Sequence, residues 1–146
     1  MKIYIGCDHA GFTRKQEVTA WLKEQNYDVI DCGCQGERTD YPVIAEKVGK
    51  SVVENSGSFG ILICGTGLGM SIAANKIKGI RAALCTECFS AKYARLHNDA
   101  NILCVGARTL GGGLTKEIID TFLHTDFEGG RHAVRVNMIR TLEENK

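Results

Sequence analysis

The sequence has almost no net charge, because 18 lysines and arginines oppose 17 aspartates and glutamates, which leaves a formal charge of +1. Because positive and negative charges balance so closely, the chain has no electrostatic reason to bind nucleic acid or an anionic membrane. An apolar run of membrane-spanning length is lacking, and no secretory or transit segment precedes the strand-like opening MKIYIGC. These absences favour a cytoplasmic protein.

Proline is nearly absent as well, since Pro42 is the only one among 146 residues. No linker, low-complexity tract or internal repeat divides the chain. A chain of this length is sufficient to bury a single hydrophobic core. We therefore expect one domain that spans residues 1–146.

Cysteine occurs seven times, an odd count that is spread along the chain rather than set in a dense disulfide framework. Two close pairs, Cys32-Gly-Cys34 and Cys85-x-x-Cys88, are candidate zinc half-sites or redox pairs. A structural zinc site usually has four nitrogen or sulfur ligands, and neither pair has its complement nearby. We favour buried or bystander thiols in a reducing compartment.

Short apolar runs alternate with amphipathic segments along the whole chain. We expect strands at 1–7, 27–32, 61–64, 79–84 and 101–105, and helices at 12–25, 42–56, 70–76, 87–96, 114–123 and across Val134, Met138 and Leu142. This βα alternation predicts an α/β fold, a three-layer, Rossmann-like sheet of five parallel strands with helices on both faces and a C-terminal helix.

Two of these helices carry a specific expectation about burial. The helix over 12–25 has Val18, Trp21 and Leu22 on its inner face, with Arg14, Lys15 and Lys23 elsewhere. The inner face expected for the helix over 114–123 comprises Leu114, Ile118, Ile119, Phe122 and Leu123.

The segments that follow the strands are the expected location of the chemistry. Ligands of open parallel sheets bind beyond the carboxyl ends of the strands. The corresponding segments are 7–11, 33–41, 64–69, 85–90 and 106–113.

The segment GILICGTGLGMSIAANK, residues 60–76, is the most informative of these. Gly65, Gly67 and Gly69 turn a buried strand directly into a helix, and Cys64 is the last strand residue. Such a turn either binds an anion or allows close helix–strand packing, and the glycines alone leave the two alternatives even. Because a helix N-terminus stabilises a thiolate, Cys64 is a candidate base or nucleophile. Neither G-x-G-x-x-G nor a P-loop is present, so a nucleotide cofactor is not expected.

Polar groups elsewhere each have a structural and a functional interpretation. Asp8 can cap a helix with His9 as a bystander, or both can serve a ligand at the sheet edge. His97 can cap a helix C-terminus. Arg131 and Arg135, one helical turn apart, can be solvated charges or can bind a phosphate together with Arg108.

Taken together, these stretches resemble one family over about residues 2–142. The chain is similar to the ribose-5-phosphate isomerase B family, which includes galactose-6-phosphate isomerase subunits. The resemblance rests on GCDHAG (6–11), ERTDYP (37–42), ICGTGLGMSIAANK (63–76), GIRAA (79–83), ARLHNDANIL (94–103), GAR (106–108) and EGGRHAVRV (128–136).

The resemblance implies a metal-free and cofactor-free interconversion of D-ribose 5-phosphate and D-ribulose 5-phosphate through a cis-enediolate, in the pentose phosphate pathway. Cys64 matches the catalytic base, Thr66 a hydroxyl that assists proton movement, and His97 the residue that opens the sugar ring. Asp8 matches a group that supports ring opening. The implied substrate-binding residues are Asp8, His9, Tyr41, Gly65, Thr66, Gly67, Leu68, Gly69, Asn98, Arg108, Arg131 and Arg135.

The same resemblance implies a homodimer or homotetramer in which His97, Asn98, Arg131 and Arg135 face the partner's Cys64. Three alternatives stay open from the sequence. They are an isomerase of allose 6-phosphate or galactose 6-phosphate, a non-catalytic phosphosugar-binding module, and a flavodoxin-like redox module that uses Cys85 and Cys88.

Overall fold

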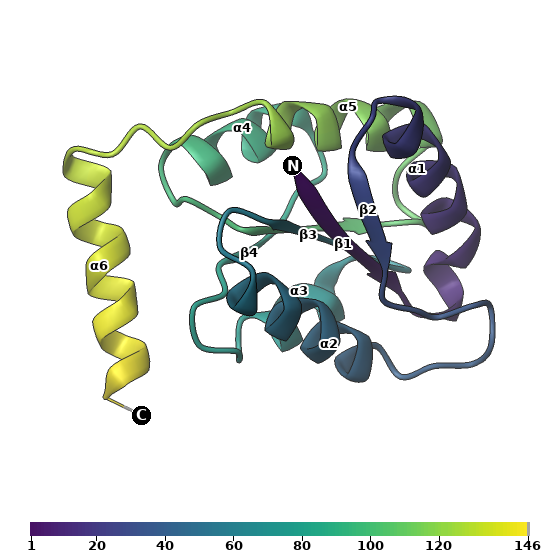
Figure 1. Ribbon diagram of the computed structural model, residues 1–146, viewed down its shortest axis with the longest axis horizontal. Helices are drawn as coiled ribbons and strands as arrows, with labels where there is room; N and C mark the ends of the chain where they lie inside the picture. Colours follow the sequence, from purple (N-terminus) through teal and green to yellow (C-terminus); the bar gives the residue numbers. More distant parts are fainter. Residues whose placement is uncertain (146) are drawn as a thin grey trace.

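The computed structural model describes residues 1–145, which form one sheet covered by helices on both faces (Figure 1). The strands are β1 (Lys2–Cys7), β2 (Asp28–Asp31), β3 (Phe59–Cys64), β4 (Ala82–Leu84) and β5 (Ile102–Gly106). The helices are η1 (His9–Gly11, a 3-10 turn), α1 (Phe12–Glu24), α2 (Tyr41–Glu54), α3 (Leu68–Ala74), α4 (Cys88–Leu96), α5 (Gly112–Leu123) and α6 (Arg131–Glu144). None of the helices within 1–145 is both long enough and apolar enough to cross a membrane.

The strand order is β2-β1-β3-β5-β4, and every neighbouring pair is parallel. A parallel sheet needs helical crossovers, and these bury both of its faces. One core cluster joins the sheet to α1, α4 and α5, and a second joins the opposite face to α2 and α3. The predicted three-layer α/β fold is confirmed.

The central strand β3 positions the glycine turn. It pairs with β1 on one side and β5 on the other, and Ile61, Leu62 and Ile63 are fully buried. Because both faces of a central strand are covered, a continuous apolar run is what such a strand requires. The carboxyl end of β3, with Cys64, is therefore fixed between the ends of β1 and β5.

Several expected boundaries differ from the structure, and so does the burial expected for individual residues. β4 begins at Ala82 rather than at Gly79, since Gly79 has a φ of +86° and belongs to a turn. β3 begins two residues earlier than expected, at Phe59. Leu114 is 39% exposed because it lies in the first turn of α5, whereas the other four residues of the expected inner face are buried.

Lys15 is the clearest correction, because it is 1% exposed rather than on the outer side of α1. Its Nζ donates to Asp31 Oδ1 at 2.7 Å and to the carbonyl of Cys34 at 2.6 Å. A buried ammonium is stable only when it is paired and hydrogen-bonded. Burial alone raises the pKa of Asp31, but hydrogen bonds from Lys15 and the Gly33 N–H outweigh it, so the pKa lies below its usual value.

Asp31→Asn is expected to lower the free energy of unfolding by about 1–2 kcal/mol at neutral pH. Removing one partner of a fully buried pair costs roughly 3–5 kcal/mol, and the one-third exposure of Asp31 reduces that cost. Because the folded-state pKa of Asp31 is depressed, its contribution is complete above the unfolded value of about 3.9 and is lost as pH falls through the folded value. Urea unfolding of both proteins between about pH 3 and 7 measures the difference.

The matched control is Glu46→Gln, which breaks the exposed Lys50–Glu46 pair and should change stability little at any pH. A stability loss in Asp31→Asn that is independent of pH would contradict the role of its charge.

Helix α6 stands beside the rest of the chain rather than on the sheet (Figure 1). Val134, Met138 and Leu142 are 62%, 64% and 66% exposed, whereas Val136 is buried. Val134, Met138 and Leu142 therefore stay mostly uncovered by the part of the chain that the structure describes.

Candidate active site

The turn after β3 holds the Cys64 thiol in a defined position. The Gly67 N–H donates to Cys64 Sγ at 3.1 Å, and the side chain is only 5% exposed. Gly67 has a φ of +80°, and a Cβ there would lie 2.5 Å from the Leu84 side chain, so only glycine fits. An N–H donor directed at sulfur stabilises a thiolate.

Thr66 follows the thiol at the tip of the turn. Its Oγ1 accepts a hydrogen bond from the Leu68 N–H at 3.3 Å, at the start of α3. The amides of Gly67 and Leu68 thus contact side chains of the turn itself. Of the residues 65–69, Gly67 and Leu68 therefore already use their N–H groups within the turn.

The Asp8 turn lies next to the end of β3. The Asp8 N–H donates to the carbonyl of Ile63 at 3.2 Å, and a Cβ on Gly11 would lie 2.5 Å from that same oxygen. Asp8 Oδ1 accepts from the Ala10 and Gly11 N–H groups at 3.0 and 3.2 Å, so the helix-cap interpretation of Asp8 is correct. The neighbouring His9 is exposed.

Arg108 and Tyr41 complete this half of the site. Backbone N–H groups of Ala107 and Arg108 donate to the carbonyls of Cys64 and Gly65 at 2.8 and 2.9 Å, which ties the two turns together. The Arg108 side chain lies over Gly65, since a Cβ there would be 3.3 Å from Arg108 Cδ and Nη1. The Tyr41 ring covers Gly69 in the same way, with Cε2 at 2.8 Å from the position of a Cβ.

His97 and Asn98 lie at the opposite edge of the sheet. α4 runs antiparallel to β4, so it ends near the amino ends of the strands. There Arg81, which immediately precedes β4, donates from Nε to the carbonyl of Asn98 at 3.0 Å. Helix α6, which carries the exposed Arg131 and Arg135, lies on this side as well (Figure 1). A single chain therefore divides the predicted site residues into two groups.

His97 has two neighbours that the sequence reasoning missed as site residues. Glu128 Oε2 lies 3.6 Å from His97 Nε2 and 3.7 Å from His132 Nε2. The two imidazole rings stack at 3.9 Å with an interplanar angle of 11°. Burial, together with His97 and Arg131, lowers the pKa of His132. Glu128 lies in the loop before α6, so no helical spacing in the sequence indicates that it lies next to His132.

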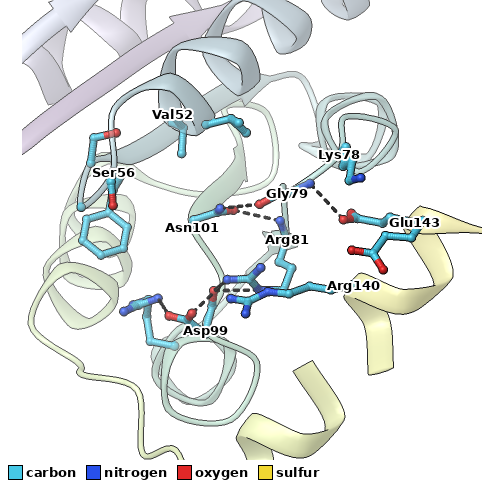
Figure 2. Close-up of a pocket in the computed structure, with 15 residues that line it drawn as sticks. Val52, Ser56, Lys78, Gly79, Arg81, Asp99, Asn101, Arg140 and Glu143 are labelled. Carbon is cyan, nitrogen blue, oxygen red and sulfur yellow. Dashed lines mark hydrogen bonds and ion pairs between the residues drawn. The ribbon is translucent and has the colours of Figure 1, made fainter. Parts of the chain in front are cut away.

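A cavity of about 530 Å³ lies at this same amino-terminal edge, between α6 and the body of the chain (Figure 2). Its charged groups are mostly paired: Arg81 binds Asp99 at 2.9 Å, and Glu143 accepts from the Gly79 N–H at 3.0 Å. Arg140 reaches into the cavity from α6. These contacts hold the end of α6 against the chain, and the cavity is separate from the Cys64 turn.

The cysteine pairs of the sequence do not form a thiol pair. The short thiol contact joins Cys7 to Cys34, with 3.8 Å between the sulfur atoms. Burial, followed by the nearby charge of Glu87, raises the pKa of Cys85 to about 12, which leaves little thiolate for redox chemistry. This environment disfavours a redox module built on Cys85 and Cys88.

Comparisons with known proteins agree over nearly the whole chain. A model of the Ribose/Galactose Isomerase family matches residues 3–139. Ribose-5-phosphate isomerase B of Escherichia coli is 49% identical over 146 residues, which cover 99% of this chain and 98% of that protein. A putative sugar phosphate isomerase of Bacillus subtilis is 47% identical, with 99% and 98% covered. The solved structure of Clostridium thermocellum ribose-5-phosphate isomerase B has a TM-score of 0.97 at 50% identity, with 99% of each chain covered.

The fold, the thiol at the glycine turn and the extent of these similarities define the protein as an α/β isomerase. More particularly, the chain belongs to the Ribose/Galactose Isomerase family.

Proposed function

We propose that the protein is an aldose–ketose isomerase that interconverts D-ribose 5-phosphate and D-ribulose 5-phosphate, a step of the pentose phosphate pathway. Residues 1–146 act as one cytoplasmic isomerase domain. The observation that carries this proposal is the Cys64 thiol, held by the Gly67 N–H beside the Asp8 turn and Arg108. No metal or cofactor takes part in the proposed reaction.

Cys64 is the proposed base of the proton transfer. Its thiolate removes the proton from C2 of the open-chain aldose while the C1 carbonyl becomes an enediolate oxygen. The same thiol then returns a proton to C1, which yields the ketose. Amides of the 65–69 turn and the Thr66 hydroxyl stabilise the developing charge and exchange protons with the sugar oxygens.

The phosphate is the proposed remote anchor. His9 and Arg108 on one side and Arg131 and Arg135 on the other supply cationic or hydrogen-bonding groups. Binding energy gained at a phosphate can be used to orient C1 and C2 against Cys64. Tyr41 is the proposed wall of the pocket beside Gly69.

The active form is proposed to be a homodimer, or a homotetramer built from it, in which each site joins the Cys64 half of one chain to the His97 half of another. The separation of the two halves at opposite edges of one sheet supports this. So do exposed apolar side chains on three helices, which a second chain can cover. These side chains include Leu68 and Ile72 of α3, Phe89 of α4, and Val134, Met138 and Leu142 of α6.

His97→Asn is expected to slow net isomerisation of ribose 5-phosphate by roughly 100-fold, because His97 is the proposed acid–base group for opening the ring. Ribulose 5-phosphate has no free hydroxyl that could close a five-membered ring, so it needs no ring opening. In the variant, Cys64 should therefore still exchange the C1 proton of ribulose 5-phosphate with solvent. Coupled assays and NMR in D₂O measure the two rates. Net turnover that stays intact would reject the ring-opening role, and an equal loss of exchange would assign His97 to the proton transfer itself.

Kinetics with different sugar phosphates tests the proposed substrate. We expect kcat/KM for ribose 5-phosphate to exceed that for allose 6-phosphate and galactose 6-phosphate. A dominant value for a hexose phosphate would contradict the pentose assignment. Tight binding of ribose 5-phosphate without turnover would instead identify a phosphosugar-binding module.

A further inference from the structure

His97, Glu128 and His132 form a cluster with the composition of a metal site, within the part of the chain that the structure describes. One nitrogen of each histidine and one oxygen of the glutamate all lie within 4.8 Å of one another. Two histidines and one glutamate are a ligand set that proteins use for zinc, with the fourth position left to water or substrate.

The distances in this cluster suit a metal better than they suit direct hydrogen bonds. The Glu128 oxygen is 3.6 and 3.7 Å from the two imidazole nitrogens, which is beyond normal hydrogen-bond length. Ligands about 2.1 Å from a tetrahedral zinc ion are about 3.4 Å apart. The two carboxylate–imidazole distances therefore exceed those of a coordination shell by only a few tenths of an ångström.

An unpartnered buried nitrogen provides independent support. His132 is 5% exposed, and its Nε2 has no hydrogen-bond partner in the structure. A buried polar atom without a partner costs about 1–3 kcal/mol, so its presence calls for an explanation. This nitrogen lies 3.7 Å from Glu128 Oε2, close enough for a cation to bind between the two atoms.

We propose that His97, Glu128 and His132 bind a divalent transition-metal ion such as Zn²⁺. Stacked rings direct their lone pairs side by side, so one ring must tilt toward the metal. His97, whose side chain is 33% exposed, has the room to do so. The metal is not a cofactor of the reaction but an inhibitor, because it occupies the nitrogen that opens the sugar ring; this consequence rests on the proposed function.

Binding is measured on the metal-free, full-length protein with Co²⁺, whose visible absorption distinguishes nitrogen and oxygen ligands from thiolates, and with Zn²⁺ against a chromogenic chelator. We expect one ion per chain and no thiolate charge-transfer band. Glu128→Gln removes a ligand from a half-exposed position where folding is not at risk. It should weaken binding by at least about tenfold, since losing even an indirect metal contact costs 10–100-fold.

Two variants serve as controls. His124→Asn removes a surface histidine that also pairs with a carboxylate, Asp120, and Cys64→Ala removes the candidate catalytic thiol. Both should bind as the unmodified protein does. Unchanged binding by Glu128→Gln, or loss of binding in Cys64→Ala, would overturn the proposed site.

The activity arm separates this inference from the proposed function. Zn²⁺ should slow isomerisation reversibly, with each protein compared with its own metal-free rate, and Glu128→Gln should need at least about ten times more Zn²⁺ for the same effect. Absence of binding overturns the metal site whatever the activity. A protein that binds the ion but never isomerises a sugar phosphate overturns the proposed function instead.

Discussion

Replacing Cys64 by alanine is expected to lower isomerase turnover by at least about 100-fold, and by up to about 10⁴-fold, the range for a lost general base. The thiol is the group that the Gly67 N–H holds at the end of β3, and the variant has nothing there to accept the C2 proton. Formation of ribulose 5-phosphate from ribose 5-phosphate measures the loss.

Cys88→Ala is the matched control, because it also removes one thiol but from the start of α4, where Cys88 is partly buried. It should retain turnover. Binding of ribose 5-phosphate by Cys64→Ala should also persist, because the phosphate is anchored elsewhere. Turnover by Cys64→Ala at the unmodified rate would reject Cys64 as the base.

Mixing two variants that are each impaired is expected to restore activity if the site is shared between chains. Arg135→Ala should lower kcat/KM by roughly 10–100-fold, since a hydrogen bond to a charged group contributes about 1.5–3 kcal/mol. A heterodimer of Cys64→Ala and Arg135→Ala has one site with both defects and one site with neither. An equal mixture with free subunit exchange should therefore recover about a quarter of the unmodified activity.

The test requires that the chains exchange, which co-expression with two different tags ensures. A mixture no more active than the two variants measured separately would place Arg135 and Cys64 in the same chain's site, or Arg135 outside it. A second mixture, of Cys64→Ala with His97→Ala, is expected to recover activity by the same rule.

The fold was predictable because its signals are local and repetitive. Buried runs such as ILIC and NILCV can only be central strands in a chain of this size, and the glycines after Cys64 end the strand where the structure ends it. Lys15 was not predictable in the same way. Its burial depends on Asp31 and the carbonyl of Cys34, which are brought to it by folding.

The site was predictable in part. Position along the chain indicates that Asp8, Cys64 and Arg108 meet, because the carboxyl ends of β1, β3 and β5 share an edge of the sheet. The same rule says nothing about His97, which follows helix α4 and therefore lies near the amino ends of the strands. Nor does it reveal the contact of His97 with His132, which depends on how the start of α6 packs against α4.

Helix α6 illustrates a further limit. Its apolar residues predict a buried face, and in one chain that face is exposed at Val134, Met138 and Leu142. Amphipathic pattern specifies that a surface is to be covered but not which chain covers it. In the proposed dimer a second copy of the chain covers this surface. The mixing experiment tests that dimer by measuring isomerase activity rather than contacts between the chains.

Deuterium transfer is the most direct test of the central claim, that Cys64 moves a proton between C2 and C1 of a pentose phosphate. With the unmodified protein in D₂O, ribulose 5-phosphate formed from ribose 5-phosphate should carry deuterium at C1, because the thiol exchanges with solvent before it returns the proton. Cys64→Ala should bind the sugar phosphate and give neither product nor exchange at C1 of added ribulose 5-phosphate. Exchange by Cys64→Ala at the unmodified rate would contradict the account.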